Sequence, residues 1–546
     1  MKTKIIIYLL FLLIMFNGIY TANAGGAERM TKDSLKTKGF LKASGRQIVD
    51  GKGNAVILRG INLANWMVPE GYIFEFEGKF NSPTRIYGLT KTLVGEEESA
   101  KFWTEFRERF ITESDIRAIA GYGFNSVRVP FHYSFFAGGK DGTEGFGLID
   151  DLVRWCKKYG VYVILDMHCA PGGQTGSNID DSVEEKPGMW PDEAKKQETV
   201  RIWGSIAEHY KDCEIIAGYD LLNEPVSKNA DQYVGDLLPM YKALVAAVRS
   251  VDGNHILFIE GAKWATNFSM FDTPIDDNMV YSFHKYWNET DADSISKYLE
   301  LSEAQNVPLW CGETGENDNQ WYYSCTELLE ANGISWCFWP WKKLEKANCP
   351  CSIKMPEGFD KIIEYTKGEE VPGKEESMKA LKGFLESIRY EKCAKNGEVV
   401  SSLMKTIPAV IEAEDFGHGG EGVSYHDSDK ENKGEKYRPL EGVDIQQVGY
   451  SVGWISDGEW LEYEVNSPSR KAYDVEFRVA SPNSSGKFRL EIEGKDVSGL
   501  ISAANTGVWS TWTTIVKKGV VIPKGRHKIR FYVISGEFNI DWIKFK

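Results

Sequence analysis

The segments YVILDM (residues 162–167) and IAGYDLL (216–222) are nearly continuous apolar runs, and the stretch between them, 194–210, has a helical pattern. The same alternation recurs from Asn54 to about residue 392. Eight apolar runs are present: VILRGIN (56–62), SVRV (126–129), YVILDM (162–167), IAGYDLL (216–222), ILFIE (256–260), VYSFH (280–284), PLWCG (308–312) and ISWCFW (334–339). Runs of this kind are typical of strands that are buried on both faces of a parallel sheet.

Amphipathic stretches separate the expected strands. They cover residues 113–121, 149–159, 194–210, 233–250, 293–304 and 320–331, and a last one covers about 376–389. Eight strands alternating with helices over roughly 340 residues predict an α/β fold of the closed (β/α)8 TIM-barrel type. The alternative is a doubly wound open sheet, which requires a glycine-rich phosphate loop after an early strand. The segment GGKDG (138–142) lacks the lysine–serine pair of such a loop, and we interpret it as a surface turn.

The pattern changes after about residue 398, where short alternating segments replace the helical periodicity. These segments are VDIQQV (443–448), EWLEYEV (459–465), YDVEFRVA (473–480), KFRLEIEG (487–494), WTTIVKKGVVI (512–522), HKIRFYVI (527–534) and FNIDWIKF (538–545). Alternation with frequent turn signals predicts an antiparallel all-β sandwich of the jelly-roll type. We therefore expect a barrel over 25–397, a short linker over 398–407 and a β-sandwich over 408–546.

The N-terminus has the features of a secretory signal. Lys2 and Lys4 precede the apolar run IIIYLLFLLIMF (5–16), and Ala22-Asn23-Ala24 follows with the small residues of a cleavage site. The run is shorter than the roughly 20 residues that a membrane-spanning helix needs. We expect residues 1–24 to be a signal peptide and the protein to be secreted, to the extracellular space or the periplasm, without a membrane anchor.

The composition excludes one class of partner and favours another. Lys and Arg number 64 and Asp and Glu number 79, which gives a net charge of −15. An acidic chain without basic runs is not a nucleic-acid binder, because phosphate binding relies on Lys and Arg. Aromatic residues make up 13% of the chain, with 17 Trp and 25 Tyr. Such side chains suit flat, amphipathic ligands such as sugar rings.

The nine cysteines form no metal-binding pattern. Their odd number leaves at least one free thiol. Cys349-Pro-Cys351 is too tight for a zinc pair, and no further C-x-x-C pair is present. Whether a disulfide joins two of Cys349, Cys351 and Cys393 stays open at this point.

Polar side chains gather where the expected barrel strands end, which is where function collects in this fold. Glu224 follows the fourth strand and Glu313 the seventh. Two carboxylates that face each other across a cleft are what glycoside hydrolysis needs. No third ligand at zinc spacing accompanies His168 and His284, so a metal-dependent reaction is not expected. The remaining strand-end residues, which would hold a sugar and tune the two carboxylates, are Arg128, His132, Asp166, His168, Asn223, His284, Tyr286, Trp339 and Trp341.

Seven motifs occur in an order and spacing that identify a family resemblance. They are RGINLANW (59–66), NSVRVPFHY (125–133), ILDMHCAPGG (164–173), LLNEP (221–225), FHKYW (283–287), GETG (312–315) and WCFWPWK (336–342). With these motifs, residues 40–390 resemble family 5 of the glycoside hydrolases, the retaining β-glycanases of the clan-A barrels. The segments RGINLANWMVPEG and DMHCAPGGQTG are similar to the β-1,3-glucanase-like and β-glucan-active branches. The long loop 71–89 would wall the cleft.

The resemblance implies a role for each strand-end residue. Glu224 would be the general acid/base and Glu313 the nucleophile. Arg128 would hydrogen-bond the nucleophile, and Asn223 would hold the 2-hydroxyl of the sugar. The side chains that would line the subsite of the cleaved sugar are His168, His284 and Tyr286, with Trp339 as its platform. His132, at the end of its strand, is also expected to bind the substrate.

Residues 408–546 resemble a family 6 carbohydrate-binding module. The matching segments are IEAEDF (411–416), EGVDIQQV (441–448), VGWISDGEWLEYEV (452–465), YDVEFRVASP (473–482), TGVWSTWTT (506–514) and FNIDWIKF (538–545). The resemblance implies that Tyr437, Trp509 and Asn539 form the ligand cleft. It also implies that Glu412, Glu414 and Asp541 hold a structural Ca²⁺, for which hard oxygen donors are suited.

The sequence thus predicts a secreted, monomeric, retaining endo-β-glucanase with a targeting module, and no cofactor for catalysis. Its substrate would be a β-glucan polysaccharide, either cellulose or a mixed-linkage β-1,4/1,3-glucan. The alternatives are an exo- or endo-β-1,3-glucanase, or a mannanase or xylanase of the same fold. Two alternatives come from other classes. One is a catalytically inactive carbohydrate-binding protein, which the presence of both glutamates disfavours, and the other is a barrel metallohydrolase.

Overall fold

The computed structural model describes residues 39–138, 144–182, 185–228, 230–434, 437–447 and 449–546. The expected signal peptide, residues 1–24, and most of the expected turn at 138–142 lie outside these ranges. Across the described ranges, the helices are all too short or too polar to cross a membrane.

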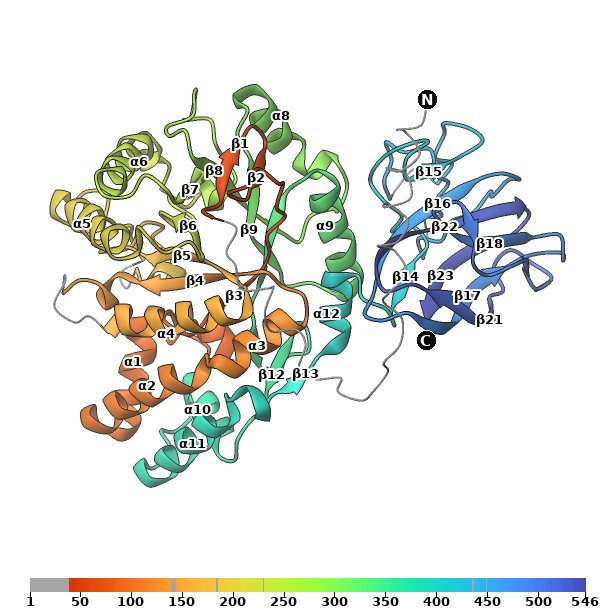
Figure 1. Cartoon of the computed structure of the whole chain (residues 1–546). Coiled ribbons are helices and arrows are strands. Elements are labelled where there is room, and N and C mark those ends of the chain that lie inside the picture. The colour runs from red at the N-terminus through yellow and green to blue at the C-terminus, as the bar shows by residue number, and fades with distance from the viewer. Residues whose placement is uncertain (1–38, 139–143, 183–184, 229, 435–436, 448) are drawn as a thin grey trace, which may run out of the picture. The chain divides into compact units, whose positions relative to one another are not determined.

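Eight parallel strands close into a barrel, as predicted (Figure 1). Each strand is hydrogen-bonded to the next along the chain, and the last pairs with the first. All eight expected runs coincide with a strand to within three residues at each end, and the first, expected at 56–62, is a strand in its last four residues. The strands are β3 (Arg59–Asn62), β4 (Ser126–His132), β5 (Tyr162–Cys169), β6 (Ile216–Asp220), β7 (Ile256–Glu260), β8 (Met279–Tyr286), β9 (Leu309–Gly315) and β10 (Ser335–Trp339).

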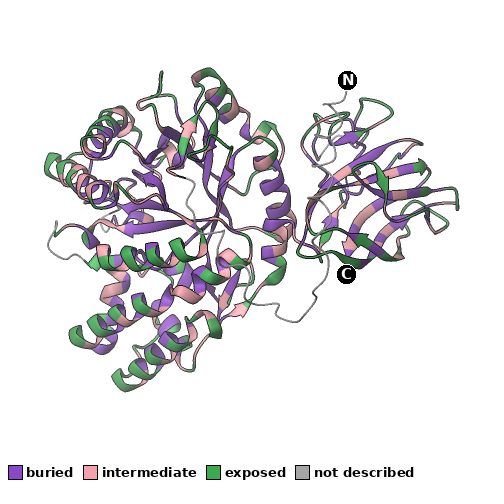
Figure 2. Cartoon of the chain, viewed as in Figure 1, coloured by how far each residue is buried: buried purple, intermediate pink, exposed green. Residues whose placement is uncertain are grey.

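Helices surround the barrel, and Figure 2 shows buried strands inside and exposed helix faces outside. Local signals set several helix starts. Thr112 and Asp115 form a reciprocal capping box at the start of α3, and the Asp192 side chain accepts hydrogen bonds from the first backbone N–H groups of α5. The predicted helices are α3 (Glu113–Gly121), α4 (Glu144–Tyr159), α5 (Glu193–Tyr210), α6 (Val234–Arg249), α8 (Ser296–Gln305), α9 (Asn319–Ala331) and α11 (Lys374–Ser387).

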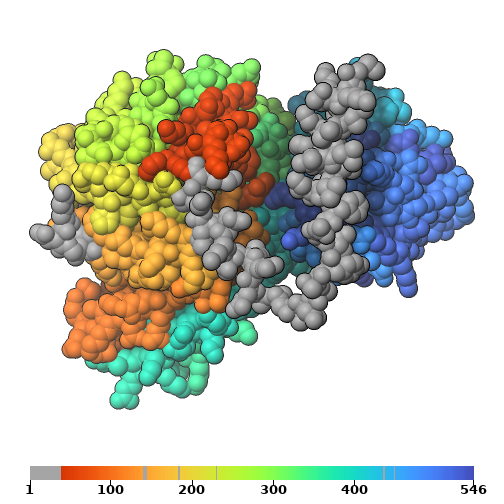
Figure 3. All heavy atoms as spheres, in the orientation of Figure 1, coloured from red at the N-terminus to blue at the C-terminus, as the bar shows by residue number. Residues whose placement is uncertain are grey.

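The segment after β3 is more ordered than the loop predicted at 71–89. It contains a 3-10 turn at Gly71–Phe74 and then α1 (Pro83–Val94) and α2 (Glu96–Phe110). These two helices pack against α11, so residues near 85–110 and near 375–385 form one continuous surface in Figure 3. This helical layer supports the wall of the cleft that begins at Glu70.

Several smaller elements were not predicted. A hairpin of β1 (Lys42–Ser44) and β2 (Gln47–Val49) precedes the barrel. A small sheet of β11 (Lys342–Leu344), β12 (Cys351–Ile353) and β13 (Ala394–Lys395) follows it, together with α10 (Phe359–Thr366). All nine cysteines are free thiols, so none of Cys349, Cys351 and Cys393 is in a disulfide.

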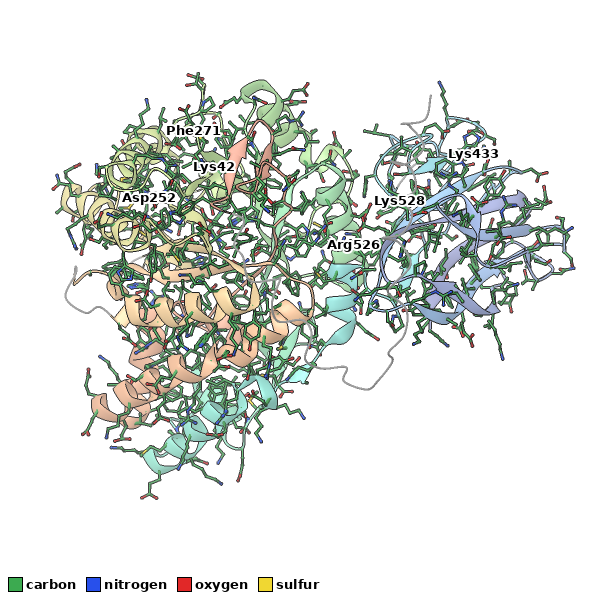
Figure 4. All side chains as sticks on the ribbon, viewed as in Figure 1. Lys42, Asp252, Phe271, Lys433, Arg526 and Lys528 are labelled. Atoms are coloured by element: carbon green, nitrogen blue, oxygen red, sulfur yellow. The ribbon has the colours of Figure 1, made fainter. Side chains whose placement is uncertain are left out.

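The amino-terminal end of the barrel strands is held by its own polar cluster. Asp252, labelled in Figure 4, lies just before β7, and its side chain accepts a hydrogen bond of 2.9 Å from the hydroxyl of Tyr219. The His255 ring also contacts this carboxylate. Stability is provided at this end, whereas the candidate functional side chains lie at the carboxyl ends of the strands.

The C-terminal module consists of two antiparallel sheets, as predicted. One sheet contains β14 (Val410–Glu412), β23 (Asn539–Phe545), β17 (Lys471–Ala480) and β21 (Thr513–Ile522). The other contains β15 (Tyr425–His426), β16 (Trp460–Ser467), β22 (Gly525–Ser535), β18 (Lys487–Ile492), β19 (Lys495–Asp496) and β20 (Ile501–Ser502). The predicted strand at 443–448 is wrong, because its described part forms only an isolated bridge between Ile445 and Val452.

The segment predicted as a linker, 398–407, is mostly helical. It forms α12 (Gly397–Met404), which packs along α9. Its apolar side chains Val399, Leu403 and Met404 are buried. The chain therefore passes from the barrel to β14 through a packed helix.

Candidate active site

Glu224 and Glu313 meet at the carboxyl ends of the barrel strands. Glu313 lies within β9, and Glu224 lies four residues beyond the end of β6. One carboxylate oxygen of each lies within 4.8 Å of the other and of a ring nitrogen of His284. Both line a cavity of about 870 Å³. The distance is close to the spacing of the two carboxyl groups in retaining glycosidases, about 5–5.5 Å.

Glu313 is held as an anion. Nη1 of Arg128 donates a hydrogen bond of 2.7 Å to Oε1, and the hydroxyl of Tyr286 donates one of 2.8 Å to Oε2. Burial raises the pKa of Glu313, but the charges of His284 and Arg128 outweigh burial, so this pKa lies below its usual value. A buried carboxylate kept ionised in this way is suited to act as a nucleophile.

Glu224 has the opposite electrostatic environment. Its Oε1 lies 2.7 Å from Nδ1 of His284. Burial raises the pKa of Glu224, and the contact with His284 offsets burial only in part, so the pKa stays above its usual value. Two neighbouring carboxyl groups whose pKa values are moved in opposite directions mark an acid and a base.

The predicted subsite residues surround this pair. Nη2 of Arg128 donates a hydrogen bond of 2.8 Å to Oδ1 of Asn223, and Nδ2 of Asn223 lies 3.4 Å from Nε2 of His168. The His168 ring stacks on Trp339 with their centroids 5.5 Å apart. The structure therefore brings these predicted residues together: His168 and Trp339 line the cavity, and Arg128 and Asn223 are fully buried.

His132 does not line the cavity described by the structure. Its Nδ1 lies 2.7 Å from the hydroxyl oxygen of Ser134, and its Nε2 lies 3.4 Å from a carboxylate oxygen of Asp181. These contacts hold the loop after β4. His132 was expected to bind the substrate because it lies at the end of a strand. That position alone does not determine the direction in which its side chain points.

A buried acidic network supports Arg128, and the sequence analysis identified only part of it. Asp166 lies 3.2 Å from Nη2 of Arg128, and Asp220 accepts a hydrogen bond of 2.9 Å from Nε. Glu260 accepts one of 3.2 Å from Nη2. All three acids are fully buried. Asp220 and Glu260 are the last residues of β6 and β7, so their position at strand ends could have identified them as site residues from the sequence.

On the nucleophile side the cavity has acidic and aromatic residues that the sequence analysis missed. Burial raises the pKa of Glu70 to about 8, and its Oε1 has no hydrogen-bond partner among the described residues. The hydroxyl of Tyr72 accepts a hydrogen bond of 2.6 Å from Nε1 of Trp339 and donates one of 3.1 Å to Glu316. Glu70 and Tyr72 come from the loop after β3, where no periodicity singles out a side chain.

The cavity lining also contains cationic residues. They are Lys228, Lys263 and Lys297, and Trp264 lines the cavity as well. Lys263, Trp264 and Ala265 are three successive non-glycine residues with positive φ, at 57°, 63° and 55°. Such backbone is disfavoured, and where it occurs it often marks a functional turn. This part of the lining lies next to the acid/base, because the N–H of Lys263 donates a hydrogen bond of 2.7 Å to the carbonyl of Val226.

Comparison with known families agrees with this geometry. Residues 87–345 match the family described as Cellulase, glycosyl hydrolase family 5. A β-xylosidase of Phanerodontia chrysosporium is 31% identical over 345 residues, which span 56% of this chain and 71% of that protein. The chain belongs to glycosyl hydrolase family 5. It is a glycoside hydrolase.

Other family 5 relatives match more distantly. Endoglucanase C of Acetivibrio thermocellus is 26% identical over 313 residues, which span 45% of this chain and 88% of that protein. The crystal structure of a β-glucanase from Saccharophagus degradans aligns with a TM-score of 0.41 at 18% identity, over 68% of this chain and 99% of that one. Residues 433–546 match the family 6 carbohydrate-binding module, as predicted.

In this family 5 hydrolase the module presents exposed tryptophans beside a buried amide. Trp509 is 45% exposed and Trp454 is 51% exposed. Nδ2 of Asn539 donates a hydrogen bond of 3.3 Å to the carbonyl of Trp509. Gly453, next to Trp454, lies so close to Asn539 that a Cβ there would be 3.1 Å from its Oδ1. The predicted cleft residues Trp509 and Asn539 are therefore neighbours, and the exposed Trp454 follows the glycine that packs against Asn539.

Tyr437, the third predicted cleft residue, has its hydroxyl occupied elsewhere. It donates a hydrogen bond of 2.7 Å to Asp415 and lies 3.1 Å from the hydroxyl oxygen of Ser324 on α9. Between described residues, no hydrogen bond joins Tyr437 to Trp509 or Asn539. Its ring packs against Tyr450, which is 43% exposed. Tyr450 is thus the more exposed ring of this pair.

The predicted calcium ligands Glu412, Glu414 and Asp541 do not come together as a group of three that could hold a metal ion among the described residues. Burial and the neighbouring charges of Asp415 and Asp541 raise the pKa of Glu412 to about 7. Glu414 is 3% exposed, and its Oε2 has no hydrogen-bond partner among the described residues. A calcium site at these residues therefore stays a prediction.

Proposed function

We propose that the protein is a secreted, retaining β-glycanase that hydrolyses β-glucan by double displacement, with Glu313 as nucleophile and Glu224 as general acid/base. The observation that carries this proposal is the carboxylate pair itself. Its oxygens lie within 4.8 Å of each other, while the pKa of Glu313 is lowered and that of Glu224 is raised. The spacing supports retention, and the opposite pKa directions support the two roles.

In the first step Oε of Glu313 attacks the anomeric carbon, and the bond from that carbon to the leaving oxygen breaks. Glu224 gives its proton to this oxygen, so the leaving sugar departs as a neutral alcohol. The product is a glycosyl ester of Glu313. Nη1 of Arg128 and the hydroxyl of Tyr286, which hydrogen-bond the two Glu313 oxygens, hold the carboxylate in place for attack.

In the second step Glu224, now ionised, takes a proton from water. The resulting hydroxide equivalent attacks the anomeric carbon from the face that the leaving group occupied, and Glu313 is released as a carboxylate. Two inversions give net retention. His284, which lies 2.7 Å from Glu224, stays with it through both protonation states.

The remaining subsite residues position the sugar. Asn223 is held by Arg128 and would bond the 2-hydroxyl, where hydrogen bonds strengthen in the transition state. Trp339, stacked with His168, would support the ring.

We propose an endo-acting β-glucanase because the motifs around β3 and β5 resemble β-glucan-active enzymes and an endoglucanase is among the relatives. The exo-acting alternative has its own support, because another relative is a β-xylosidase. Purified protein should be screened on barley β-glucan, carboxymethylcellulose, laminarin, mannan and xylan. The chain length of early products then separates endo from exo action. Chelator treatment tests the metallohydrolase alternative, and a lack of turnover on all five substrates would favour the inactive binding protein.

The mechanism is tested by NMR of early products and by covalent labelling. Retention predicts that the β-anomer appears first from a β-linked substrate. A 2-fluoro-glycoside should label Glu313, because the fluorine slows breakdown of the ester intermediate. An α-anomer formed first, or a label on another residue, would overturn the assignment.

We further propose that the module targets the enzyme to insoluble glycan through Trp509, Trp454 and Asn539, and that Glu412, Glu414 and Asp541 hold a structural Ca²⁺. The proposals of a monomer and of secretion rest on the sequence. Size-exclusion chromatography and analysis of the culture medium test them.

A further inference from the structure

Glu260 ends β7 and is completely buried, yet the reaction described above uses no atom of it. Its backbone N–H donates a hydrogen bond of 3.1 Å to the hydroxyl of Tyr241 on α6. Burial raises the pKa of Glu260, but the charges of His284 and Arg128 outweigh burial, so this pKa lies below its usual value. The buried network around Arg128 and His284 therefore contains a carboxylate with a lowered pKa besides Glu313.

The two oxygens of this carboxylate contact three parts of the catalytic machinery. Oε2 accepts a hydrogen bond of 2.6 Å from the backbone N–H of Glu224. Oε1 lies 3.2 Å from Nε2 of His284 and accepts a hydrogen bond of 3.2 Å from Nη2 of Arg128. One side chain thus reaches the acid/base, the histidine beside it and the arginine that holds the nucleophile.

The backbone of Glu224 requires such a partner. Its φ is 44°, and Val226 two residues later has a φ of 61°. Residues with a Cβ adopt this left-handed conformation only when the surroundings hold them there. A backbone N–H that points into a buried site also needs an acceptor. The carboxylate of Glu260 is the acceptor that the structure provides.

The ring of His284 lies between the carboxyl groups of Glu224 and Glu260. Its Nδ1 lies 2.7 Å from Glu224, and its Nε2 faces Glu260. Burial lowers the pKa of His284, but the charges of Glu260 and Glu313 outweigh burial and hold it well above its usual value. Glu260 therefore acts on the ring that contacts the acid/base through an ion-pair contact, which is not a hydrogen bond, and helps to keep the ring charged.

We propose that Glu260 is a positioning residue for proton donation: it holds the Glu224 turn in its left-handed conformation and orients His284 against the Glu224 carboxyl group. This inference rests on the proposed roles of Glu224 and Glu313. We therefore expect that a change of Glu260 slows the reaction of substrates whose leaving group needs a proton from Glu224. Attack by Glu313 should be slowed less.

The smaller effect on attack follows from the other partners of Arg128. Asp220 accepts a hydrogen bond of 2.9 Å from Nε, and Asp166 lies 3.2 Å from Nη2. These contacts keep the guanidinium aimed at Glu313 when Glu260 is changed. Asp220 is equally buried and bonds the same arginine, but its hydrogen bond goes to Arg128 and not to Glu224 or His284. It is therefore a matched control.

The experiment compares Glu260→Gln and Asp220→Asn in the full-length protein on two aryl β-glycosides of the sugar that the polysaccharide screen identifies. Departure of 2,4-dinitrophenolate needs no proton, whereas departure of phenol does. We expect kcat/KM of Glu260→Gln to fall about 100-fold on the phenyl glycoside and about fivefold or less on the dinitrophenyl glycoside, in line with the usual size of general-acid effects. Asp220→Asn should change both by the same factor.

Glu260→Asp gives a second variant in case the glutamine protein does not fold. It keeps the charge but retracts the carboxylate by one methylene, so it should lose the bond to the Glu224 N–H and show the same dependence on the leaving group. Equal losses on the two substrates, or unchanged kinetics, would overturn the proposal.

A crystal structure of the Glu260→Gln or Glu260→Asp protein provides a readout that does not depend on activity. The Glu224 carboxyl group should move away from His284, or the turn should leave positive φ. An unmoved turn contradicts the positioning role. If the wild-type protein hydrolyses none of the glycosides but the turn moves as expected, the proposed function fails and the role of Glu260 in the structure stands.

Discussion

The catalytic cavity of the barrel and the aromatic face of the module contrast in how they expose polar and aromatic groups. In the cavity the polar groups are charged and buried, such as Arg128, and the aromatic platform Trp339 is only 5% exposed. On the module Trp454 and Trp509 are about half exposed, and the polar group beside them is the neutral amide of Asn539. Reaction at an anomeric carbon needs carboxyl groups whose pKa values are set by burial. Binding alone needs only rings that cover the faces of a sugar.

The largest expected effect is that of Glu313→Ala, because this change removes the nucleophile of both steps. We expect kcat to fall by about 10⁴-fold or more, as it does when other covalent nucleophiles are removed. Sodium azide should restore turnover and give a glycosyl azide of inverted configuration, because azide occupies the space that the carboxylate leaves. Loss of the module's ligands should have no effect of this size. Product analysis by NMR and mass spectrometry provides the measurement.

Glu224→Gln should remove the alkaline side of the pH profile. Hydrolysis needs Glu313 ionised and Glu224 protonated, so kcat/KM should fall at low pH as Glu313 takes up a proton and at high pH as Glu224 loses one. The pKa of Glu313 is lowered and that of Glu224 is raised, so the plateau between the two limbs should be wide. The variant has no proton to lose at this position. Its residual activity on a 2,4-dinitrophenyl glycoside should therefore show the acidic limb alone.

Two variants of Glu224 test which group gives rise to each limb of the pH profile. Azide should give a glycosyl azide of retained configuration with Glu224→Ala, because the ester on Glu313 still forms. An alkaline limb that survives in Glu224→Gln at the wild-type pH would mean that another group, such as His284, supplies the proton.

The strand pattern predicted the centre of the site but not its surroundings. Glu224, Glu313 and Arg128 could be found because strand ends in a barrel converge on one place, whatever the rest of the chain does. Glu70 and Trp264 come from irregular segments in which periodicity carries no information. Glu260 is at a strand end, but nothing in the sequence shows that its carboxylate reaches the backbone of Glu224.

The same limit of sequence periodicity explains which residues of the module were predicted and which were not. Trp509 and Asn539 are neighbours because the side chain of Asn539, at the start of β23, donates a hydrogen bond to the backbone carbonyl of Trp509. Tyr437 belongs to a loop whose path the sequence does not determine, and its hydroxyl bonds Asp415 instead of lying free beside Trp509. Trp454 was missed because it has no counterpart in a periodic segment.

A smaller effect is expected from Trp509→Ala in the full-length protein. Loss of one stacked ring should weaken binding to insoluble β-glucan by about 10-fold, since a ring stacked on a sugar contributes on the order of 1 kcal/mol or slightly more. Turnover of soluble oligosaccharides should be unchanged, because the module holds no reacting group. Val508→Ala, at the exposed neighbouring position, is the control. Depletion assays on insoluble glucan measure the difference, and equal binding by the two variants would remove Trp509 from the ligand face.

The last expected effect is on stability and not on activity, and it concerns the acidic cluster of the module. The charge of Asp541 raises the pKa of Glu412, and the charge of Glu412 raises that of Glu414, so a bound Ca²⁺ should relieve this repulsion and stabilise the folded state. At a concentration 100 times its Kd the ion would add about 2.7 kcal/mol. For a domain of this size that is a rise in Tm of several degrees, roughly 10 °C at most.

Differential scanning calorimetry of the full-length protein in Ca²⁺ and in EDTA measures this shift, and the endotherm of the module should move while that of the barrel does not. Glu414→Gln should abolish the response, because it removes the carboxylate whose Oε2 has no protein partner among the described residues. The same change should leave the Tm in EDTA unchanged or higher, since it also removes a buried like charge. A variant that is less stable than wild type in EDTA, yet still responds to Ca²⁺, would show that Glu414 acts through its hydrogen bond with Gln320 and not as a calcium ligand.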